Sequence, residues 1–448
     1  MAARADTIAA IATAPGRGGI GIVRVSGPLA GDIARAVAGR IPPPRHATFA
    51  RFAGPGLALL DEGIALYFPA PNSYTGEDVL ELQGHGGPVV LREILRLCVD
   101  LGARLAEPGE FTRRAFLNDR LDLAQAEGVA DLIDAASAEA ARGAARSLVG
   151  EFSARVDALV DSLTRLRMHV EACIDFPEEE IDPADREAQR EALGAIRADL
   201  AELLGEAAQG AVLREGLTVV LVGRPNVGKS SLLNRLAGEE VAIVTPVAGT
   251  TRDYVRATIL LEGVPIHLID TAGLRDSGDE VERIGIARTW DAIAKAGAVM
   301  LVTDAAQEGR DEESRILGRM PAGLPLARVT NKIDLAGLPA GRDAQGREVR
   351  LRLSAKTGEG VAALRAWLLE VAGWRPSSEG VFLARERHLV ALREAASALG
   401  AAAGQHMQAF ELFAEDLKLA QQSLGMITGE VTADDLLGQI FGRFCIGK

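Results

Sequence analysis

The sequence predicts a multidomain α/β protein: an N-terminal α+β domain, an α-helical domain, and a third domain with a mostly parallel sheet inserted into the helical one. The chain has 448 residues, which favours two or three domains. Apolar residues recur at helical spacing on both sides of the middle third. Within that third, helices alternate with short apolar strands, the pattern of a parallel sheet that carries ligand loops at its strand ends. We expect these strands at 217–222, 264–269, 298–303, 326–330 and 349–353.

Composition narrows the class of protein. The formal net charge of −13 argues against nucleic-acid binding over the whole surface, although a local basic face remains possible. The cysteines Cys98, Cys173 and Cys445 are far apart and odd in number. We therefore expect no disulfide framework or zinc site, and a reducing cytoplasm. No apolar run approaches the ~20 residues of a membrane span, and no signal peptide precedes Asp6.

Residues 1–118 predict the α+β domain. The segments TIAAIAT, GIGIVRVSG, GIALYF and DVLELQGHG are strand-like, and helices are expected near 28–39 and 87–101. The run GRGGIGIVR at 16–24 lacks the spacing of a dinucleotide fingerprint, so it predicts a tight turn between strands. His85 in GHGG is a candidate catalytic residue, but a loop histidine bonded to backbone is favoured.

Residues 119–212 and 376–448 predict one helical domain in two parts, with 213–375 inserted between ends that lie close together. The first part is expected as a long helical stretch over 122–172, a break at FPEEEIDP, and a second helix over 184–208. Its apolar stripes comprise Leu148, Phe152, Val156, Leu159, Leu163, Leu166 and Val170, then Leu193, Ile196, Leu200 and Leu203. Helices are also expected at 384–401, 408–424 and 432–443, the last with Thr432 as N-cap and Asp435 at its third position.

The inserted segment opens with GRPNVGKS at 223–230, which matches G-x-x-x-x-G-K-S, the phosphate-binding loop of nucleoside triphosphatases. An apolar strand precedes it and a helical stretch, SLLNRLAG, follows, as the motif requires. The glycines let backbone N–H groups turn around a polyphosphate, which the helix N-terminus also favours. We expect Lys229 to reach the β- and γ-phosphates and Ser230 to bind magnesium. A Gly-rich turn without a ligand is the alternative for this motif by itself.

Two further motifs predict the part of the site that binds magnesium. DTAG at 270–273 ends a second apolar strand, where Asp270 would hold magnesium through water and the Gly273 amide would sense the γ-phosphate. GTTRD at 249–253 lies between the two motifs, where a switch loop must cover the metal. Thr251 is its candidate ligand.

Two more motifs predict recognition of a base. The Asp334 carboxylate of NKID, at 331–334, can accept two N–H bonds from guanine that adenine does not offer, and such a site discriminates strongly. SAK at 354–356 can close over the base. Five motifs in this order are typical of a GTPase of the translation-factor-related class.

The residue that follows DTAG is Leu274, where many small GTPases have a glutamine that orients the attacking water. Glu282 is near enough along the chain to take this role, with a solvated helix-start carboxylate as the alternative. Arg275 is a candidate arginine finger, although a switch-surface charge is favoured. Asn226 offers an oxygen beside the phosphates, where a monovalent cation could supply positive charge, with carbonyls of loop 245–250 completing its shell.

The GTP-binding residues that the sequence predicts belong to these motifs and to the switch loop. They are Asn226, Val227, Gly228, Lys229, Ser230, Ser231, Thr245, Pro246, Val247, Ala248, Gly249, Thr250, Thr251, Asp270, Thr271, Ala272, Gly273, Asn331, Lys332, Asp334, Ser354, Ala355 and Lys356. Ser230 and Thr251 are the predicted magnesium ligands, and Glu282 is the predicted catalytic residue.

The whole chain resembles the tRNA modification GTPase family MnmE, also called TrmE. The resemblance is carried by TAPGRGGIGIVRVSG at 13–27, PNSYTGEDVLELQGHGG at 71–87, EPGEFTRRAFLNDRLDLAQAEGVADLI at 107–133, the GTPase motifs with GTTRD, and the terminal FCIGK at 444–448. It implies an N-terminal folate-binding domain that dimerises, a helical domain and an inserted GTPase.

The resemblance also implies an activity. Members of this family work with a flavoprotein partner, MnmG (GidA), to install an aminomethyl-type group at carbon 5 of the wobble uridine in certain tRNAs. A tetrahydrofolate derivative, in its 5,10-methylene or 5-formyl form, supplies the one-carbon unit. The implied folate-binding residues are Arg24, Glu81, Arg120 and Lys448; relatives often have lysine at position 120. The implied potassium ligands are Asn226, Thr245, Val247 and Thr250, and potassium would promote contact between the GTPase domains of a homodimer.

Two alternatives stay open at this stage. Cys445 lies four residues from the end and mimics a prenylation box, but a terminal lysine is outside the usual set, and lipidation would block a role at the folate site. We favour a tail that delivers Cys445 and Lys448 towards that site. The chain could also be a GTP-controlled ribosome or assembly-factor switch without modification chemistry, and then the N-terminal third would need no folate pocket.

Overall fold

The structure is a computed structural model that describes residues 6–54, 59–175, 183–238, 255–270, 290–306, 317–321, 323–345, 348–375, 381–405, 409–430, 434–442 and 444–447. The chain forms two compact units. The first contains residues 1–130, 148–165 and 417–448, and the second contains residues 131–147 and 166–416. Each unit gathers parts of several of the four segments expected from the sequence, so that segment division stays a prediction.

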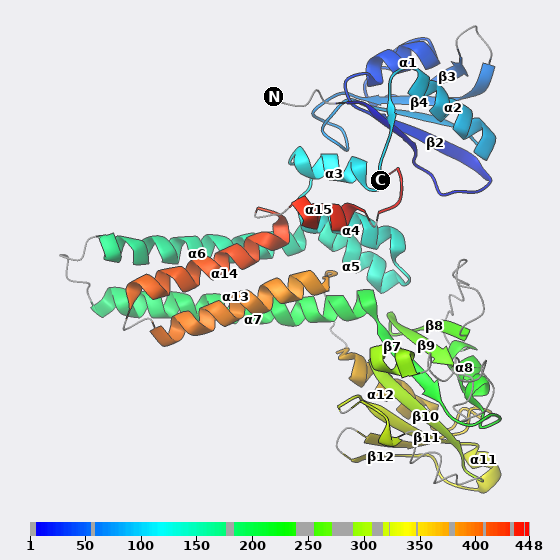
Figure 1. Ribbon diagram of the computed structural model, residues 1–448, viewed down its shortest axis with the longest axis vertical. Coiled ribbons are helices and arrows are strands. Elements are labelled where there is room, and N and C mark those ends of the chain that lie inside the picture. Colours follow the sequence, from blue (N-terminus) through cyan, green and yellow to red (C-terminus); the bar gives the residue numbers. More distant parts are fainter. Residues whose placement is uncertain are drawn as a thin grey trace. The chain divides into compact units, whose positions relative to one another are not determined.

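The first unit contains a six-stranded sheet with the strand order β3-β4-β5-β2-β1-β6. The N-terminal α+β prediction is confirmed, although β3 and β6 were not foreseen. Helices α1 (Ala30–Ala38) and α2 (Pro88–Asp100) cover one face, as Figure 1 shows in blue and light blue. The strands are β1 (Ile8–Ile11), β2 (Gly18–Ser26), β3 (Thr48–Ala53), β4 (Leu59–Phe68), β5 (Val79–Gly86) and β6 (Arg104–Leu105).

Alternation along the strands separates the two faces of this sheet. Val23, Val25, Leu80 and Leu82 are buried beneath the two helices, while Arg24 and Glu81 lie on the opposite face. The Gly-rich run at 16–24 enters through a turn at Gly16, where φ is 134°, and most of it then forms β2. The expected tight turn is therefore only the start of this run.

Helix α3 (Glu110–Leu117) and helix α15 (Asp434–Phe441) bring the C-terminal residues to the N-terminal part of the chain. Phe441 and Phe444 pack with Leu123, and the ring centroids of Phe116 and Phe441 lie 6.4 Å apart. Pro108 and Ile446 then form an isolated antiparallel bridge. These contacts place residues 444–447 beside the loop that precedes α3.

The helical stretch expected over 122–172 is instead three helices, α4 (Leu123–Asp134), α5 (Ala138–Leu148) and α6 (Glu151–Asp175). Two local features cause the breaks. The Ser137 hydroxyl accepts a hydrogen bond from the Ala140 N–H and caps α5, and Gly150 adopts a left-handed φ of 88°. The apolar stripe continues from Leu148 to Phe152 across the second break, so the sequence pattern did not reveal that break.

The remaining helices agree better with expectation. Helix α7 (Pro183–Glu215) is longer than expected and lies beside α13 (Glu386–Gln405), while α14 (Phe410–Thr428) lies beside α6 (Figure 1). In the first unit, the Gln421 amide donates to the Thr164 hydroxyl at 3.1 Å. Thr432 and the residues of FPEEEIDP before Pro183 lie outside the described residues. No helix among the described residues is long and apolar enough to cross a membrane.

The second unit contains a seven-stranded sheet with the order β12-β13-β11-β10-β7-β9-β8. Strands β13, β11, β10, β7 and β9 are parallel, and the edge strands β12 and β8 are antiparallel to their neighbours. All five expected strands are present. The bounds are β7 (Leu217–Val222), β8 (Val255–Leu261), β9 (Val264–Asp270), β10 (Ala298–Asp304), β11 (Leu326–Asn331), β12 (Gly341–Gln345) and β13 (Glu348–Arg352).

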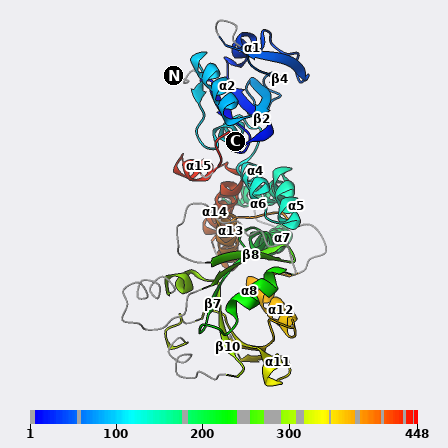
Figure 2. The same cartoon turned by 90° about the vertical axis from the view of Figure 1, so that its right-hand side faces the viewer.

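Helices α8 (Lys229–Gly238) and α12 (Val361–Ala372) cover one face of this sheet, as Figure 2 shows. Leu232, Leu236 and Trp367 pack there against inward-facing residues of the strands. Residues of 290–296 and 317–324 pack on the other face, with Ile293 fully buried. Because both faces of the sheet are covered, the sequences of the parallel strands are near-continuous apolar runs. The short helix α11 (Ile333–Ala336) follows β11.

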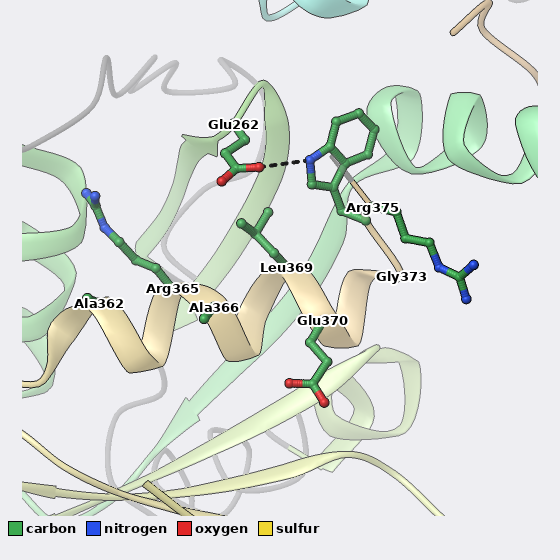
Figure 3. Close-up of a pocket in the computed structure, with 9 residues that line it drawn as sticks. Glu262, Ala362, Arg365, Ala366, Leu369, Glu370, Gly373 and Arg375 are labelled. Atoms are coloured by element: carbon green, nitrogen blue, oxygen red, sulfur yellow. Dashed lines mark hydrogen bonds between the residues drawn. The ribbon is translucent and has the colours of Figure 1, made fainter. Parts of the chain in front are cut away.

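An open pocket of about 620 Å³ lies between α12 and the turn that joins β8 to β9 (Figure 3). Trp374 donates from its indole nitrogen to the Glu262 carboxylate at 3.1 Å across it. The β8–β9 turn precedes β9, whereas the ligand loops follow the parallel strands. None of the described residues that line the pocket is a predicted nucleotide-site residue, so the pocket is not part of the site described below.

Two sets of contacts hold together the helices and segments through which the chain enters and leaves the seven-stranded sheet. Gln209 of α7 donates to the Gly373 carbonyl at 2.9 Å and accepts from the Arg375 N–H at 2.8 Å, so the chain enters and leaves the sheet side by side. Asp131 of α4 accepts from Arg214 at 2.9 Å and from Arg385 at 2.7 Å. Arg214 lies in the last turn of α7, and Arg385 lies directly before α13.

We expect Asp131→Asn to lower the free energy of unfolding by about 2 kcal/mol, because the Asp131 side chain is only 8% exposed and serves both arginines. Urea unfolding of the full chain measures the change. Asp134→Asn is the matched control, because Asp134 is an exposed carboxylate at the end of the same helix. Equal unfolding midpoints for the two variants would show that the Asp131 contacts contribute little.

Candidate functional site

The loop between β7 and α8 has the backbone that a phosphate-binding loop requires. Gly223 has a φ of 153°, and a Cβ there would lie 2.3 Å from the Val302 carbonyl oxygen. Gly228 has a φ of 98°, and Asn226 adopts a left-handed φ of 65°. Of the non-glycine residues, asparagine is among the few that tolerate this conformation. The sequence therefore fits a loop whose N–H groups converge on an anion.

Lys229 lies across the mouth of this loop. Its ammonium donates to the carbonyls of Gly223 at 2.8 Å and Arg224 at 3.2 Å. Burial lowers the pKa of Lys229, and the nearby Asp270 carboxylate partly opposes this effect. The hydrogen bonds of this ammonium go to neutral loop carbonyls, so a polyphosphate would be a stronger partner.

Ser230 and Asp270 meet where the magnesium is expected. The Ser230 hydroxyl lies 3.5 Å from Asp270 Oδ2, and Asp270 Oδ1 is buried without a hydrogen-bond partner among the described residues. Burial raises the pKa of Asp270, against the effects of Lys229 and Ser230. An orphaned carboxylate oxygen beside a hydroxyl suits a hydrated divalent cation, so these residues fit magnesium.

Asn331, at the end of β11, joins the phosphate loop to the loop at 354–356. Its side-chain amide donates to the Val227 carbonyl at 2.9 Å, and its oxygen accepts from the Ala355 N–H at 2.9 Å. The Ser354 hydroxyl donates to Asp334 Oδ1 at 2.7 Å, so the other carboxylate oxygen can face a ligand. The structure thus brings the predicted phosphate and base residues together around one edge of the sheet.

Lys332 makes a second connection to the phosphate loop, which the sequence motifs predicted only in part. Its ammonium donates to the Asn226 carbonyl at 2.7 Å and to Asp304 Oδ2 at 2.7 Å. The hydrogen bond from Lys332 lowers the pKa of Asp304. Sequence reasoning missed Asp304, although its position was a usable signal: it ends β10, as Asp270 ends β9, and such strand ends carry ligand residues.

The predicted switch residues lie outside the described residues. These are Thr245, Pro246, Val247, Ala248, Gly249, Thr250, Thr251, Thr271, Ala272, Gly273 and Glu282, together with Leu274 and Arg275. Ser231 and Lys356 are described and exposed, at the start of α8 and in the base loop. The roles assigned to all of these residues stay predictions.

A second group of predicted residues lies in the first compact unit. Arg24 of β2 and Glu81 of β5 are directly opposite in the strand register, and Arg24 donates to Glu81 Oε1 from Nε at 3.0 Å. The guanidinium also lies 5.5 Å from the ring centroid of Tyr74 and 5.8 Å from that of Phe111. The pair is only 19% and 14% exposed.

The C-terminal tail approaches this pair. Arg24 Nη1 donates to the Gly447 carbonyl at 3.5 Å, and the Gly109 N–H donates to the Cys445 carbonyl at 3.4 Å. A Cβ at Gly447 would lie 2.4 Å from the Ile11 carbonyl oxygen, so the tail passes close to the sheet. Arg120 packs its side-chain carbons over Gly76, in the loop that also carries Tyr74. Lys448 lies outside the described residues.

The environment of His85 differs from the one that the sequence predicts. It lies in strand β5, not in a loop, and its ring Nδ1 contacts Asp61 Oδ1 at 2.7 Å. Against the effect of burial, the hydrogen bonds from His85 and Glu62 hold the pKa of Asp61 below its usual value. A neighbouring strand therefore supplies the histidine's partner, which its own loop sequence could not reveal. The three cysteines are free, as expected; Cys98 is buried and Cys445 is exposed.

The fold and the nucleotide-site geometry place the chain in the class of P-loop GTP hydrolases. A parallel sheet carries the phosphate-loop motif after β7, the predicted metal-side Asp270 at the end of β9 and the predicted base motif from the end of β11. The G domain of the T. maritima FeoB iron transporter is 28% identical to this chain over 35% of it and 98% of that chain, with a TM-score of 0.27. A score this low carries no structural inference.

The chain belongs to the MnmE family of tRNA modification GTPases. The family model described as "MnmE helical domain" matches residues 123–445, and that described as "GTP-binding protein TrmE N-terminus" matches residues 7–120. A tRNA modification GTPase MnmE of Thiobacillus denitrificans is 61% identical over 99% of this chain and 98% of its own length. One of Burkholderia cenocepacia is 58% identical over 100% of both chains. The chain is therefore a GTP hydrolase that acts in tRNA modification.

We expect Asp270→Asn to raise the melting temperature of the nucleotide- and metal-free protein at pH 7, because it removes a half-buried carboxylate whose pKa is raised by burial. The difference from wild type should shrink as the pH falls through that raised pKa, where Asp270 itself becomes neutral. Magnesium-dependent GTP hydrolysis should fall by about 100-fold or more, since the hold on the metal is lost.

Asp304→Asn is the control, because it should change the melting temperature in the opposite direction. Its hydrogen bond with Lys332 lowers the pKa of Asp304, so its charged form stabilises the folded protein above the usual aspartate pKa. This variant should melt below wild type at pH 7. If both variants shift the melting temperature in the same direction, the assigned electrostatic environments are wrong.

Proposed function

We propose that this protein is a potassium-stimulated GTPase that acts with a flavoprotein partner of the MnmG (GidA) kind. Together they form the carboxymethylaminomethyl (aminomethyl-type) group at carbon 5 of the wobble uridine of certain tRNAs. The one-carbon unit comes from a tetrahydrofolate derivative in its 5,10-methylene or 5-formyl form. The observation that carries the proposal is the convergence of Arg24, Glu81 and the C-terminal tail, because a simple GTP switch has no need of it.

The surroundings of Arg24 and Glu81 support folate as the ligand. Arg24 lies beside the rings of Tyr74 and Phe111 while it pairs with the Glu81 carboxylate, so one place offers charge and apolar ring surface. Basic groups suit the glutamate tail of folate, and a carboxylate suits the donor edge of its pterin ring. Arg120 and Lys448 would complete the set; the first lies over the loop that carries Tyr74, and the second follows Gly447.

The GTPase side of the proposal assigns each group one task. Lys229 binds the β- and γ-phosphates, Ser230 and Thr251 bind magnesium, and Asp270 holds the metal through water. When bound, magnesium neutralises charge on the phosphates. Glu282 orients the attacking water, in place of the glutamine that Leu274 replaces.

Potassium would supply the positive charge that an arginine finger supplies in other GTPases. Asn226 supports this role, because its side chain is exposed at the tip of the phosphate loop and its left-handed backbone is held by Lys332. The oxygens of Thr245, Val247 and Thr250 would complete the potassium shell.

An exposed apolar pair supports a homodimer formed through the N-terminal sheet. Phe49 and Ile64 are opposite each other on β3 and β4, and they are 66% and 40% exposed. A cross-strand pair of this kind on an uncovered sheet face suits burial against a second copy. We propose a cytoplasmic protein without a membrane partner that binds MnmG and tRNA in this dimeric state.

The experiment that tests the proposed function is mass analysis of tRNA nucleosides from cells that lack this protein, with and without complementation. Loss of the modified wobble uridine, restored by the wild-type gene, supports it. An unchanged nucleoside profile together with a ribosome-assembly defect would favour the switch without modification chemistry. Stoichiometric binding of a reduced folate to the purified protein separates the same two functions.

GTP hydrolysis should be faster in potassium than in sodium by about 10-fold or more, because a cation that fits the shell offsets developing charge. Asn226→Gly should remove most of this difference with little loss of nucleotide affinity. Glycine is the better replacement, because the left-handed φ of 65° would strain an alanine. Asn226→Ala measured in parallel reports that strain as a lower melting temperature. Equal turnover of the wild-type protein in both salts would exclude a potassium site.

Deletion of residues 445–448 should abolish wobble-uridine modification and leave GTP turnover nearly intact. The deletion ends after Phe444, which is buried against Leu123 and Phe441, so the packed part of the C-terminus remains. It removes mainly the backbone contacts of Cys445, Ile446 and Gly447. Melting temperature, GTP turnover and tRNA modification are measured on one preparation.

Phe444→Ala is the matched control for this deletion. It removes a buried aromatic side chain and should destabilise the protein by about 3 kcal/mol, with a clear fall in melting temperature. If the deletion resembles this control and lowers stability and both activities together, the tail is a structural cap. Full modification activity in the deletion variant would separate the tail from the folate site.

A further inference from the structure

Arg235 connects the helix that carries the phosphate-binding residues to the loop of the base site. It lies in the last turn of α8, whose first residues are Lys229 and Ser230. Its Nε donates to the Ala355 carbonyl at 3.0 Å, and its Nη2 donates to the neighbouring Lys356 carbonyl. One guanidinium therefore holds two consecutive carbonyls, a geometry that its planar fork suits.

These two carbonyls belong to the loop whose other polar groups form the base site. The Ala355 N–H donates to Asn331, and the Ser354 hydroxyl donates to Asp334 while it accepts from the Thr357 N–H at 3.1 Å. The loop is thus held from one side by Asn331 and from the other by Arg235. Its position relative to Asp334 depends on both.

A simpler role for Arg235 would be to offset the dipole of its own helix, as basic residues in a last turn often do. The contacts argue against this as its main role. Both acceptors lie 120 residues or more further along the chain, outside α8. Arg235 is also half-buried, and a Cβ at Gly358 would lie 4.0 Å from its guanidinium carbon, so a further residue of the same loop lies close to the group.

We propose that Arg235 is a positioning residue for guanine specificity: it holds the loop at 354–357 so that the loop and Asp334 engage the base together. This inference rests on the base site proposed above. The two carbonyls that accept from Arg235 belong to the base loop and lie apart from the phosphate loop in the chain. Loss of Arg235 should therefore weaken contacts to the base and spare contacts to the phosphates.

The test uses the full-length protein with Arg235→Ala and Arg235→Lys. Because a charge-assisted hydrogen bond changes an equilibrium by about 10-fold or more, Arg235→Ala should weaken GDP binding by at least that factor. The affinity for ADP, whose base cannot make the Asp334 pair, should stay unchanged. The KM for GTP should rise while kcat at saturating GTP stays within about twofold of wild type. Arg235→Lys keeps the charge but loses the planar guanidinium, so its GDP affinity should lie between those of wild type and Arg235→Ala.

Arg342→Ala is the control, because Arg342 pairs with Glu370 elsewhere in the same unit and should leave nucleotide affinity unchanged. Equal losses of GDP and ADP affinity, a kcat that falls with the affinity, or GDP affinity within about twofold of wild type would each overturn the proposal. If Arg235→Ala does not fold, the same criteria apply to Arg235→Lys.

Asp334→Asn, measured in parallel, separates this inference from the base-site assignment. A shift of preference towards xanthosine nucleotides in that variant, with unchanged selectivity in the Arg235 variants, leaves the base site standing and removes the role of Arg235. If Asp334→Asn stays strictly specific for guanine, both the base-site assignment and the role of Arg235 are wrong.

Discussion

The nucleotide site depends on one buried carboxamide. Asn331 is 2% exposed, and its two polar atoms join the Val227 carbonyl of the phosphate loop to the Ala355 N–H of the base loop. A Cβ at Gly228 would lie 2.3 Å from the Asn331 amide nitrogen, so the phosphate loop must have glycine where the two segments meet. Together with Lys332 and Arg235, this side chain connects the phosphate end of the site to its base end, and its loss would leave two buried backbone groups without partners.

The same unit uses side chains to connect its sheet with its helices. The Ser137 hydroxyl, which caps α5, donates to the Gly263 carbonyl in the β8–β9 turn at 2.9 Å, and Trp374 donates to Glu262 in that turn. Strand β9 begins at this turn and ends at Asp270, on the metal side of the site. One strand thus runs from the helical contacts to Asp270, whose predicted role is to hold magnesium.

Sequence reasoning succeeded where the information was contiguous. The phosphate loop, the strand that ends at Asp270 and the base motif at Asn331 are short runs between buried strands, and the structure has them where the pattern indicates. It was less accurate for the helices between residues 122 and 172. Ser137 caps a new helix there, and Gly150 interrupts the apolar stripe between Leu148 and Phe152 without changing its period.

The sequence by itself determined the class of site and the family, because the spacing of its motifs and nearly its whole length carry that information. Tertiary structure alone decided which distant residues cooperate. The pairing of His85 with Asp61, the Arg24–Glu81 pair beside the tail, and the hold of Arg235 on the base loop each join segments far apart in the chain. Such contacts follow from strand register and packing, which bring partners together without leaving a local pattern around either residue.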